Sequence, residues 1–256
     1  MKLALVIIGM TTLTVSVMLA PPTRSSNVLR NQDKVTYQPT GSEGAIIGKI
    51  SFDGKPPQPR RIDGSADSVC EADGSELFTQ DVIVKAGKLA NVFVYVQSGD
   101  ALNWYTFDAP STEVSLAHRG CQYVPHLLAM NVQQTLKVAN EDTTTHNTHF
   151  TGKNNADWNQ SQAQEAPVLT HKFTAPEIPI TVKDNHHPWE KAYVAVFSHP
   201  FFAVSALNGS YTISGLPPGQ YTVVAWHEKF GEQRAEVSVG VKERKNLDFS
   251  FKLPDN

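Results

Sequence analysis

The 256-residue sequence has little charge and little cysteine. Charged residues make up 18% of the chain and the net charge is −3, whereas about a quarter of the residues in an average soluble domain are charged. A nucleic-acid-binding surface needs a basic patch or stripe, so this balance argues against a nucleic-acid partner. Apolar residues make up 40%, which is enough for a sizeable core in one large or two ordinary domains.

Local motifs of the common enzyme classes are also missing. The sequence contains no G-x-S-x-G elbow, H-E-x-x-H zinc motif, phosphate loop or dinucleotide fingerprint. A non-catalytic protein is therefore expected. The alternative is a metal-dependent enzyme that uses an open coordination position.

The N-terminal segment predicts export. Residues 1–20 begin with one basic residue and continue as an uncharged, largely apolar stretch, which is typical of a signal peptide. Because Pro21 and Pro22 follow directly, the cleavage site is poor, and an uncleaved N-terminal anchor stays open as the alternative. Residues 21–43 are polar and aperiodic, as in a disordered linker. We expect a periplasmic or cell-surface protein that touches a membrane only through an uncleaved N-terminal segment.

The two cysteines are Cys70 and Cys121. In an exported chain an even number of cysteines favours a disulfide, and the alternative is two buried free thiols. The bond would close a loop of about 50 residues and contribute roughly 3–4 kcal/mol to stability.

Short apolar runs separated by turn residues predict an all-β fold. In the run from Leu89 to Val96, Val92, Val94 and Val96 alternate with their neighbours, which indicates one buried face. From Glu113 onward, strands recur at the spacing of a sandwich. Residues 152–167 lack a period and are expected to form a long loop.

These patterns divide the folded part into three segments. They are N-terminal strands at 44–112, a first sandwich at 113–203, and four short strands around a Pro-Gly turn at 204–256. The N-terminal strands either complete the C-terminal sandwich or stand apart from it.

All nine histidines lie beyond residue 117, and seven of them are near strand ends or turns. Histidine is the commonest metal-ligating side chain. Three segments combine histidine with other polar donors: Cys121–His126, Asn140–His149 and Asp184–Glu190.

The pattern N-x-D-x-x-x-H-N over residues 140–147, followed by H-P-W at 187–189, resembles the cupredoxin family. More closely, the chain resembles exported bacterial proteins, some labelled methylamine-utilisation-like. These pair a cupredoxin-like Greek-key sandwich with a carboxypeptidase-regulatory-like β-sandwich. The second part of the resemblance rests on residues 208–211, 215–221 and 225–228. That sandwich also resembles the carbohydrate-binding-like accessory domain of rhamnogalacturonan lyases.

The resemblance implies a ligand set. In cupredoxins an early histidine and a late C-x-x-H-x-x-M loop bind copper. Carried over by position, His146 and His187 are the imidazole ligands, and Asp184 and Glu190 stand where cysteine and methionine would be. Blue copper depends on the thiolate, so no intense blue colour and no fast electron transfer are expected.

The remaining nitrogen and oxygen donors suit Cu(II) or Zn²⁺. The alternative is a vestigial pocket that binds no metal. His126 and His149 are further candidate ligands, although strand alternation turns His149 away from His146. His118 and His171 are expected to be ordinary strand residues. The competing function is a module that binds a polysaccharide or another partner of the cell envelope.

Overall fold

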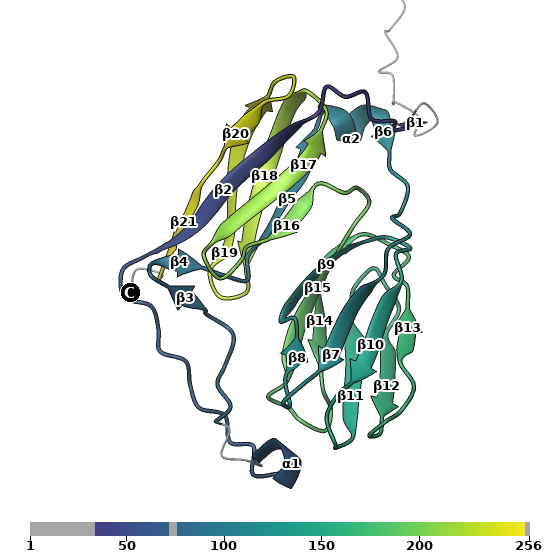
Figure 1. The fold of residues 1–256 in the computed structure, drawn as a ribbon, viewed down its shortest axis with the longest axis vertical. Coiled ribbons are helices and arrows are strands. Elements are labelled where there is room, and N and C mark those ends of the chain that lie inside the picture. The colour runs from purple at the N-terminus through teal and green to yellow at the C-terminus, as the bar shows by residue number, and fades with distance from the viewer. Residues whose placement is uncertain (1–33, 72–75, 254–256) are drawn as a thin grey trace, which may run out of the picture. The chain divides into compact units, whose positions relative to one another are not determined.

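The computed structural model describes residues 34–71 and 76–253, which fold almost entirely as β-strands (Figure 1). The predicted export segment at 1–20 lies outside the described residues. Within them, no helix is both long and apolar enough to cross a membrane. The two helices are α1 (Ser68–Glu71) and α2 (Asp100–Trp104). The predicted all-β class is therefore confirmed.

One sandwich is built from both ends of the described chain, and we call it the terminal sandwich. Its first sheet has the order β16 (Phe202–Val204), β5 (Phe93–Gly99), β18 (Gly219–His227) and β19 (Gly231–Val239). Its second sheet has the order β17 (Ser210–Leu216), β2 (Gly44–Asp53), β4 (Lys88–Leu89) and β3 (Val84–Lys85), and β20 (Arg244–Asn246) and β21 (Phe249–Lys252) pair with β2. Segments 44–112 and 204–256 thus share one pair of sheets.

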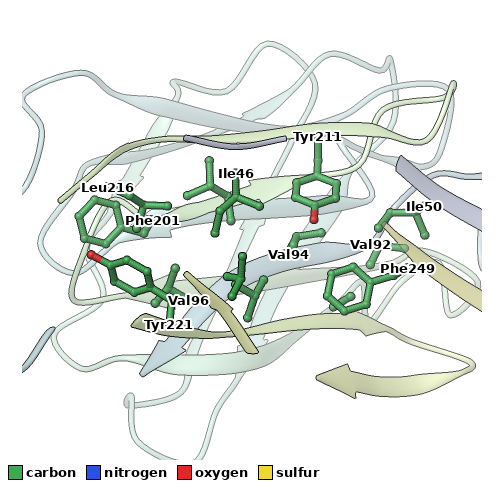
Figure 2. Packing of buried hydrophobic residues seen from close by; sticks show 14 of the residues in the cluster. Ile46, Ile50, Val92, Val94, Val96, Phe201, Tyr211, Leu216, Tyr221 and Phe249 are labelled. Carbon is green, nitrogen blue, oxygen red and sulfur yellow. The ribbon is translucent and has the colours of Figure 1, made fainter. Parts of the chain in front are cut away.

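The core of the terminal sandwich is filled by aliphatic and aromatic side chains from both sheets (Figure 2). Val92, Val94 and Val96 point into it, in agreement with their alternation. Phe93 and Tyr95, on the other face of β5, are buried as well. The prediction of one buried face was wrong, because the second face of β5 packs against residues of a second sandwich, which is formed by residues 114–197.

The middle sandwich follows in one continuous stretch of chain. One sheet has the order β13 (Leu169–His171), β10 (Leu136–Asn140), β7 (Val114–His118) and β8 (Tyr123–Val124). The other has the order β12 (Trp158–Gln162), β11 (His146–Thr151), β14 (Glu177–Lys183), β15 (Lys191–Phe197) and β9 (Leu127–Asn131). The expectation of a long loop at 152–167 is wrong for the centre of this segment, where β12 pairs with β11.

The described part of the predicted linker also differs from expectation. β1 (Val35–Thr36) pairs in parallel with β6 (Tyr105–Thr106). The Tyr37 ring packs on Tyr105 and Phe107 at centroid distances of 4.9 and 5.7 Å. Aromatic packing orders this stretch, although its composition is polar.

The strand register brings several polar residues to one end of the middle sandwich. The parallel pairing of β7 with β10 places His118 opposite Asn140, where both strands end. In the facing sheet, β11 begins at His146, β14 ends at Lys183 and β15 begins at Lys191. The loops between these strands therefore meet at a single rim.

Two buried histidines outside this rim make stability sensitive to acid. Burial lowers the pKa of His199 and of His227 to about 4. Because both folded values lie below the unfolded value near 6.5, the stabilisation is present above pH 6.5 and is lost as the pH falls toward 4. We expect each histidine to contribute about 3 kcal/mol to this loss.

Chemical denaturation at a series of pH values measures the effect. In each histidine, Nδ1 accepts a hydrogen bond from the backbone N–H two residues later. A His199→Asn/His227→Asn variant retains an acceptor there but cannot titrate. Its stability should fall less steeply between pH 6.5 and 4, and an unchanged slope would contradict the assignment.

Candidate metal centre

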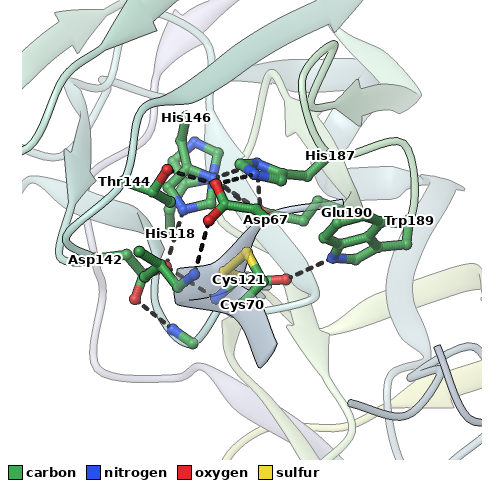
Figure 3. The surroundings of a disulfide bond; sticks show 12 residues. Asp67, Cys70, His118, Cys121, Asp142, Thr144, His146, His187, Trp189 and Glu190 are labelled. Carbon is green, nitrogen blue, oxygen red and sulfur yellow. Dashed lines mark hydrogen bonds and ion pairs between the residues drawn. A yellow bond between two sulfur atoms is a disulfide. The ribbon is translucent and has the colours of Figure 1, made fainter. Parts of the chain in front are cut away.

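The centre is built from the first residue of β11 and the loop between β14 and β15 (Figure 3). In that loop the Asp184 carboxylate accepts hydrogen bonds from the backbone N–H groups of His186 at 2.6 Å and His187 at 3.0 Å. It also accepts from the N–H of Asn147 at 2.8 Å, which ties the loop to β11. Asp184 therefore organises the loop and at the same time faces the centre.

Both ring Nδ1 atoms point inward. His146 Nδ1 lies 3.0 Å from His187 Nδ1, 3.0 Å from Asp184 Oδ2 and 3.0 Å from Glu190 Oε1. His187 Nδ1 lies 3.5 Å from Asp184 Oδ2 and 3.7 Å from Glu190 Oε1. In a tetrahedral site with bonds near 2 Å, neighbouring ligand atoms are about 3.3 Å apart. These five separations are in the range that ligand atoms of a single small ion require.

The outer nitrogen of each ring faces a carboxylate. His146 Nε2 lies 3.0 Å from Asp142 Oδ2, and His187 Nε2 lies 3.1 Å from Asp67 Oδ2. Asp142 is held by the backbone N–H groups of Gly120 and Cys121. In a neutral ring, a carboxylate that accepts the Nε2 proton leaves the Nδ1 lone pair free, as in the carboxylate–histidine pairs that support metal ligands. Both rings are thereby set to bind through Nδ1.

His118 completes the buried set. Its ring is parallel to His146 at a centroid distance of 4.4 Å, its Nδ1 lies 2.8 Å from Glu190 Oε2, and its Nε2 lies 2.8 Å from Thr148 Oγ1. His118, His146, Asp184 and Glu190 offer ligand atoms within 4.8 Å of one another, and all four are buried. His118 orients Glu190 and is not the ordinary strand residue expected from the sequence.

One donor atom has no hydrogen-bond partner. Glu190 Oε1 is fully buried and unsatisfied among the described residues. Although it lies 3.0 Å from His146 Nδ1, that nitrogen carries at most one proton, and Asp184 accepts it. Buried polar oxygens are seldom left unpaired. A cation between these groups would satisfy Glu190 and suits the donor set.

The electrostatics favour positive charge at this rim. Burial alone would lower the pKa of His146, but the nearby carboxylates of Asp142, Asp184 and Glu190 outweigh it and raise the pKa to about 11. Burial works against the charged form of Asp184, yet its bonds to His146 and to backbone N–H groups hold its pKa well below the usual range. A bound metal ion would replace the proton on His146, so affinity should rise with pH.

The predicted disulfide between Cys70 and Cys121 is confirmed. It attaches α1, and with it Asp67, to the rim of the middle sandwich (Figure 3). Thr144 donates a hydrogen bond of 2.6 Å to Asp67, and the Trp189 indole N–H donates to the Cys121 carbonyl. A segment about 80 residues before His146 in the chain therefore contributes one of the outer carboxylates.

A comparison with known families supports one part of the sequence resemblance. The family model of the carboxypeptidase regulatory-like domain matches residues 177–252, which includes β14 and β15 as well as the last strands of the terminal sandwich. No curated protein matches the chain.

Several solved structures are similar to part of the chain. A copper-containing nitrite reductase from Thermus scotoductus is 16% identical over 41% of this chain, with a TM-score of 0.32, and the match spans 28% of the reductase. A purple cupredoxin from Nitrosopumilus maritimus is 19% identical over 33% of this chain and 99% of its own, with a TM-score of 0.29. Amicyanin from Paracoccus versutus is 16% identical over 41% of this chain and 97% of its own, with a TM-score of 0.30.

Two of the six predicted ligands are not part of this centre. His149 Nε2 lies 3.5 Å from Asp157 on the face of β11 opposite His146, as strand alternation requires. His126 Nε2 is within hydrogen-bond distance of the buried Glu228 carboxylate, in the turn that follows β18. These two expectations were wrong: the first residue lies on the other side of its strand, and the second is held by the neighbouring sandwich.

The His126–Glu228 pair lines a cavity of about 410 Å³. Its walls include Trp189, Glu190 and Lys191. Lys191 Nζ lies 3.5 Å from Glu228, so the buried carboxylate also has a cationic partner. The cavity and the candidate metal centre thus share the segment from Trp189 to Lys191.

Proposed function

We propose that the chain is an exported, non-catalytic binding protein that holds one divalent ion at the rim of its middle sandwich. His146 and His187 would bind through Nδ1, and Asp184 and Glu190 would bind through oxygen. The proposal rests on one observation above all. Four donor atoms face one another while each outer ring nitrogen lies within hydrogen-bond distance of a carboxylate.

The donor geometry favours Zn²⁺ over Cu(II). The five separations quoted for these atoms range from 3.0 to 3.7 Å, close to the single edge length of a tetrahedron. A square-planar Cu(II) site would combine edges near 2.8 Å with diagonals near 4 Å for bonds of about 2 Å. Zinc has no geometric preference of its own and accepts the tetrahedral arrangement.

The same shell supports a binding role. Structural zinc sites have four protein ligands, whereas catalytic sites keep a position open for water or substrate. Here four protein donors would supply all four ligands, and His146, Asp184, His187 and Glu190 are all buried. Export is supported by the disulfide, since such bonds persist in oxidising compartments.

A carbohydrate-binding role has less support. Sugars stack on exposed aromatic faces, but Trp158 packs on Phe150 at a centroid distance of 5.2 Å. Trp189 is committed through its indole N–H to Cys121. Trp104 is exposed, but one aromatic side chain alone does not form a sugar platform.

Metal titration of the full chain, purified without chelators and then stripped, tests the proposal. Isothermal titration should show one Zn²⁺ per chain. An Asp142→Asn variant replaces the charged acceptor for the His146 Nε2 proton with a neutral amide and should bind about 10–100-fold more weakly, the usual cost of disturbing such a partner.

Asp157→Asn is the matched control, because Asp157 stands beside His149 as Asp142 stands beside His146. Its affinity should equal that of the wild type. If the wild type takes up neither Zn²⁺ nor Cu(II), the proposed function is refuted.

A further inference from the structure

The sulfur missing from the ligand loop is present on the other side of the same two histidines. Asp67, Cys70 and His187 offer ligand atoms within 4.8 Å of one another, and so do Cys121, Asp142 and His146. The disulfide joins the two groups. Each group surrounds the outer edge of one ring, where Nε2 meets Asp67 or Asp142. Figure 3 shows both sulfurs with His146, His187 and the two outer carboxylates.

We propose that reduction of the Cys70–Cys121 disulfide creates a second, sulfur-containing metal site on the outer side of His146 and His187. Its ligands are the two thiolates and the two Nε2 atoms. Thiolate and imidazole donors in this number form tetrahedral sites for Zn²⁺, and thiolates also select Cu(I). The ligand class is therefore a thiophilic cation of this type.

The reaction balances with a dithiol as the reductant. The dithiol gives two electrons and two protons to the disulfide, the S–S bond breaks, and the reductant leaves as its own disulfide. When the metal ion binds, the two new thiols release their two protons. The sulfur atoms then have to separate to about 3.8 Å, the spacing set by Zn–S bonds near 2.3 Å in a tetrahedron.

The inner and outer sites cannot be filled together by neutral histidines. A neutral imidazole has one protonated and one free nitrogen. When Nε2 binds a metal ion, the proton moves to Nδ1, where Asp184 and Glu190 lie 3.0 Å from His146. The oxidised chain would thus bind through nitrogen and oxygen, and the reduced chain through nitrogen and sulfur. In both states the stoichiometry is one ion per chain.

Cadmium titration followed by ultraviolet absorption tests this inference, because Cd²⁺ is a soft zinc substitute whose thiolate complexes absorb in the ultraviolet. The full chain is titrated as the disulfide, and again after reduction by a dithiol that is then removed without air. We expect one Cd²⁺ per chain in the reduced state, with a thiolate band that is missing in the oxidised state.

Two variants under the same reducing conditions identify the ligands. Cys70→Ser/Cys121→Ser should show no band and bind Cd²⁺ at least about 100-fold more weakly than the reduced wild type. His146→Gln/His187→Gln should retain some band but lose affinity to a similar degree. A reduced wild type without a thiolate band overturns the inference, and so does a histidine variant with unchanged affinity.

Circular dichroism keeps the test decisive if reduction unfolds the chain. Cd²⁺ should then restore the β-sheet spectrum of the reduced wild type but not that of the serine variant. If Cd²⁺ does not restore the spectrum of the reduced wild type, the inference is refuted. The oxidised titration reports on the inner site alone. If only the reduced chain binds Cd²⁺, this inference stands and the proposed function is refuted. If only the oxidised chain binds Cd²⁺, the proposed function stands and this inference is refuted.

Discussion

A His146→Gln/His187→Gln variant is expected to bind Zn²⁺ on the order of a thousandfold or more weakly than the wild type. Structural zinc sites bind with about 10–16 kcal/mol, and two of the four inner donors are lost. Glutamine is suited to these positions because its amide can still donate to Asp142 and Asp67, which face the outer ring edges. The lower Zn²⁺ affinity would therefore result from the missing ligand atoms and not from outer carboxylates that have lost their hydrogen-bond partners.

Competition with a chromophoric zinc chelator measures the difference. His149→Gln is the control, since His149 lies on the same strand three residues later and faces Asp157. Near-ultraviolet circular dichroism shows whether the variant has kept its packing around Trp189 and the disulfide. If a folded double variant binds Zn²⁺ as tightly as the control, these two histidines are not the ligands.

The convergence of the four inner donor residues was predictable because they lie in two short stretches of sequence. The spacing of Asp184, His187 and Glu190 places all three in one loop between two strands. His146 follows a strand and a turn, and antiparallel pairing of β11 with β14 brings it to the same rim. Local sequence patterns and one strand pairing, that of β11 with β14, are enough to predict that these four residues lie at one rim.

The supporting residues could not be found in this way. His118 reaches the centre through the parallel pairing of β7 with β10, and parallel strands carry no short turn that would reveal the pairing in the sequence. Asp67 arrives with a segment that only the disulfide and its hydrogen bonds attach to this rim. The cysteine count indicated the bond but not that it lies beside the histidines.

Asp142 was visible in the sequence but was not assigned a role. It belongs to the N-x-D-x-x-x-H-N pattern, four residues before His146. Its function depends on the backbone N–H groups of Gly120 and Cys121, which turn its carboxylate toward the ring. An aspartate shortly before a candidate ligand was thus the available signal, and only the fold shows what it does.

Restoring the two sulfur residues by Asp184→Cys/Glu190→Met should turn a colourless or pale Cu(II) complex into an intensely coloured one. A blue-copper site needs two histidines, a cysteine thiolate and a weak axial methionine. The Asp184 carboxylate faces Nδ1 of both histidines, at 3.0 and 3.5 Å. It already accepts hydrogen bonds from the backbone N–H groups of Asn147 and His187. The same donors would stabilise an introduced thiolate at this position.

Visible absorption of the Cu(II)-loaded proteins measures the gain. The wild type should show only weak ligand-field bands, because its inner donors are nitrogen and oxygen. Asp157→Cys is the control, since it places a thiol beside a single histidine, His149, and should remain pale. An intense thiolate-to-copper band in the oxidised wild type would mean that sulfur already reaches the metal ion. A pale double variant that still binds copper would mean that Asp184 does not occupy the ligand position.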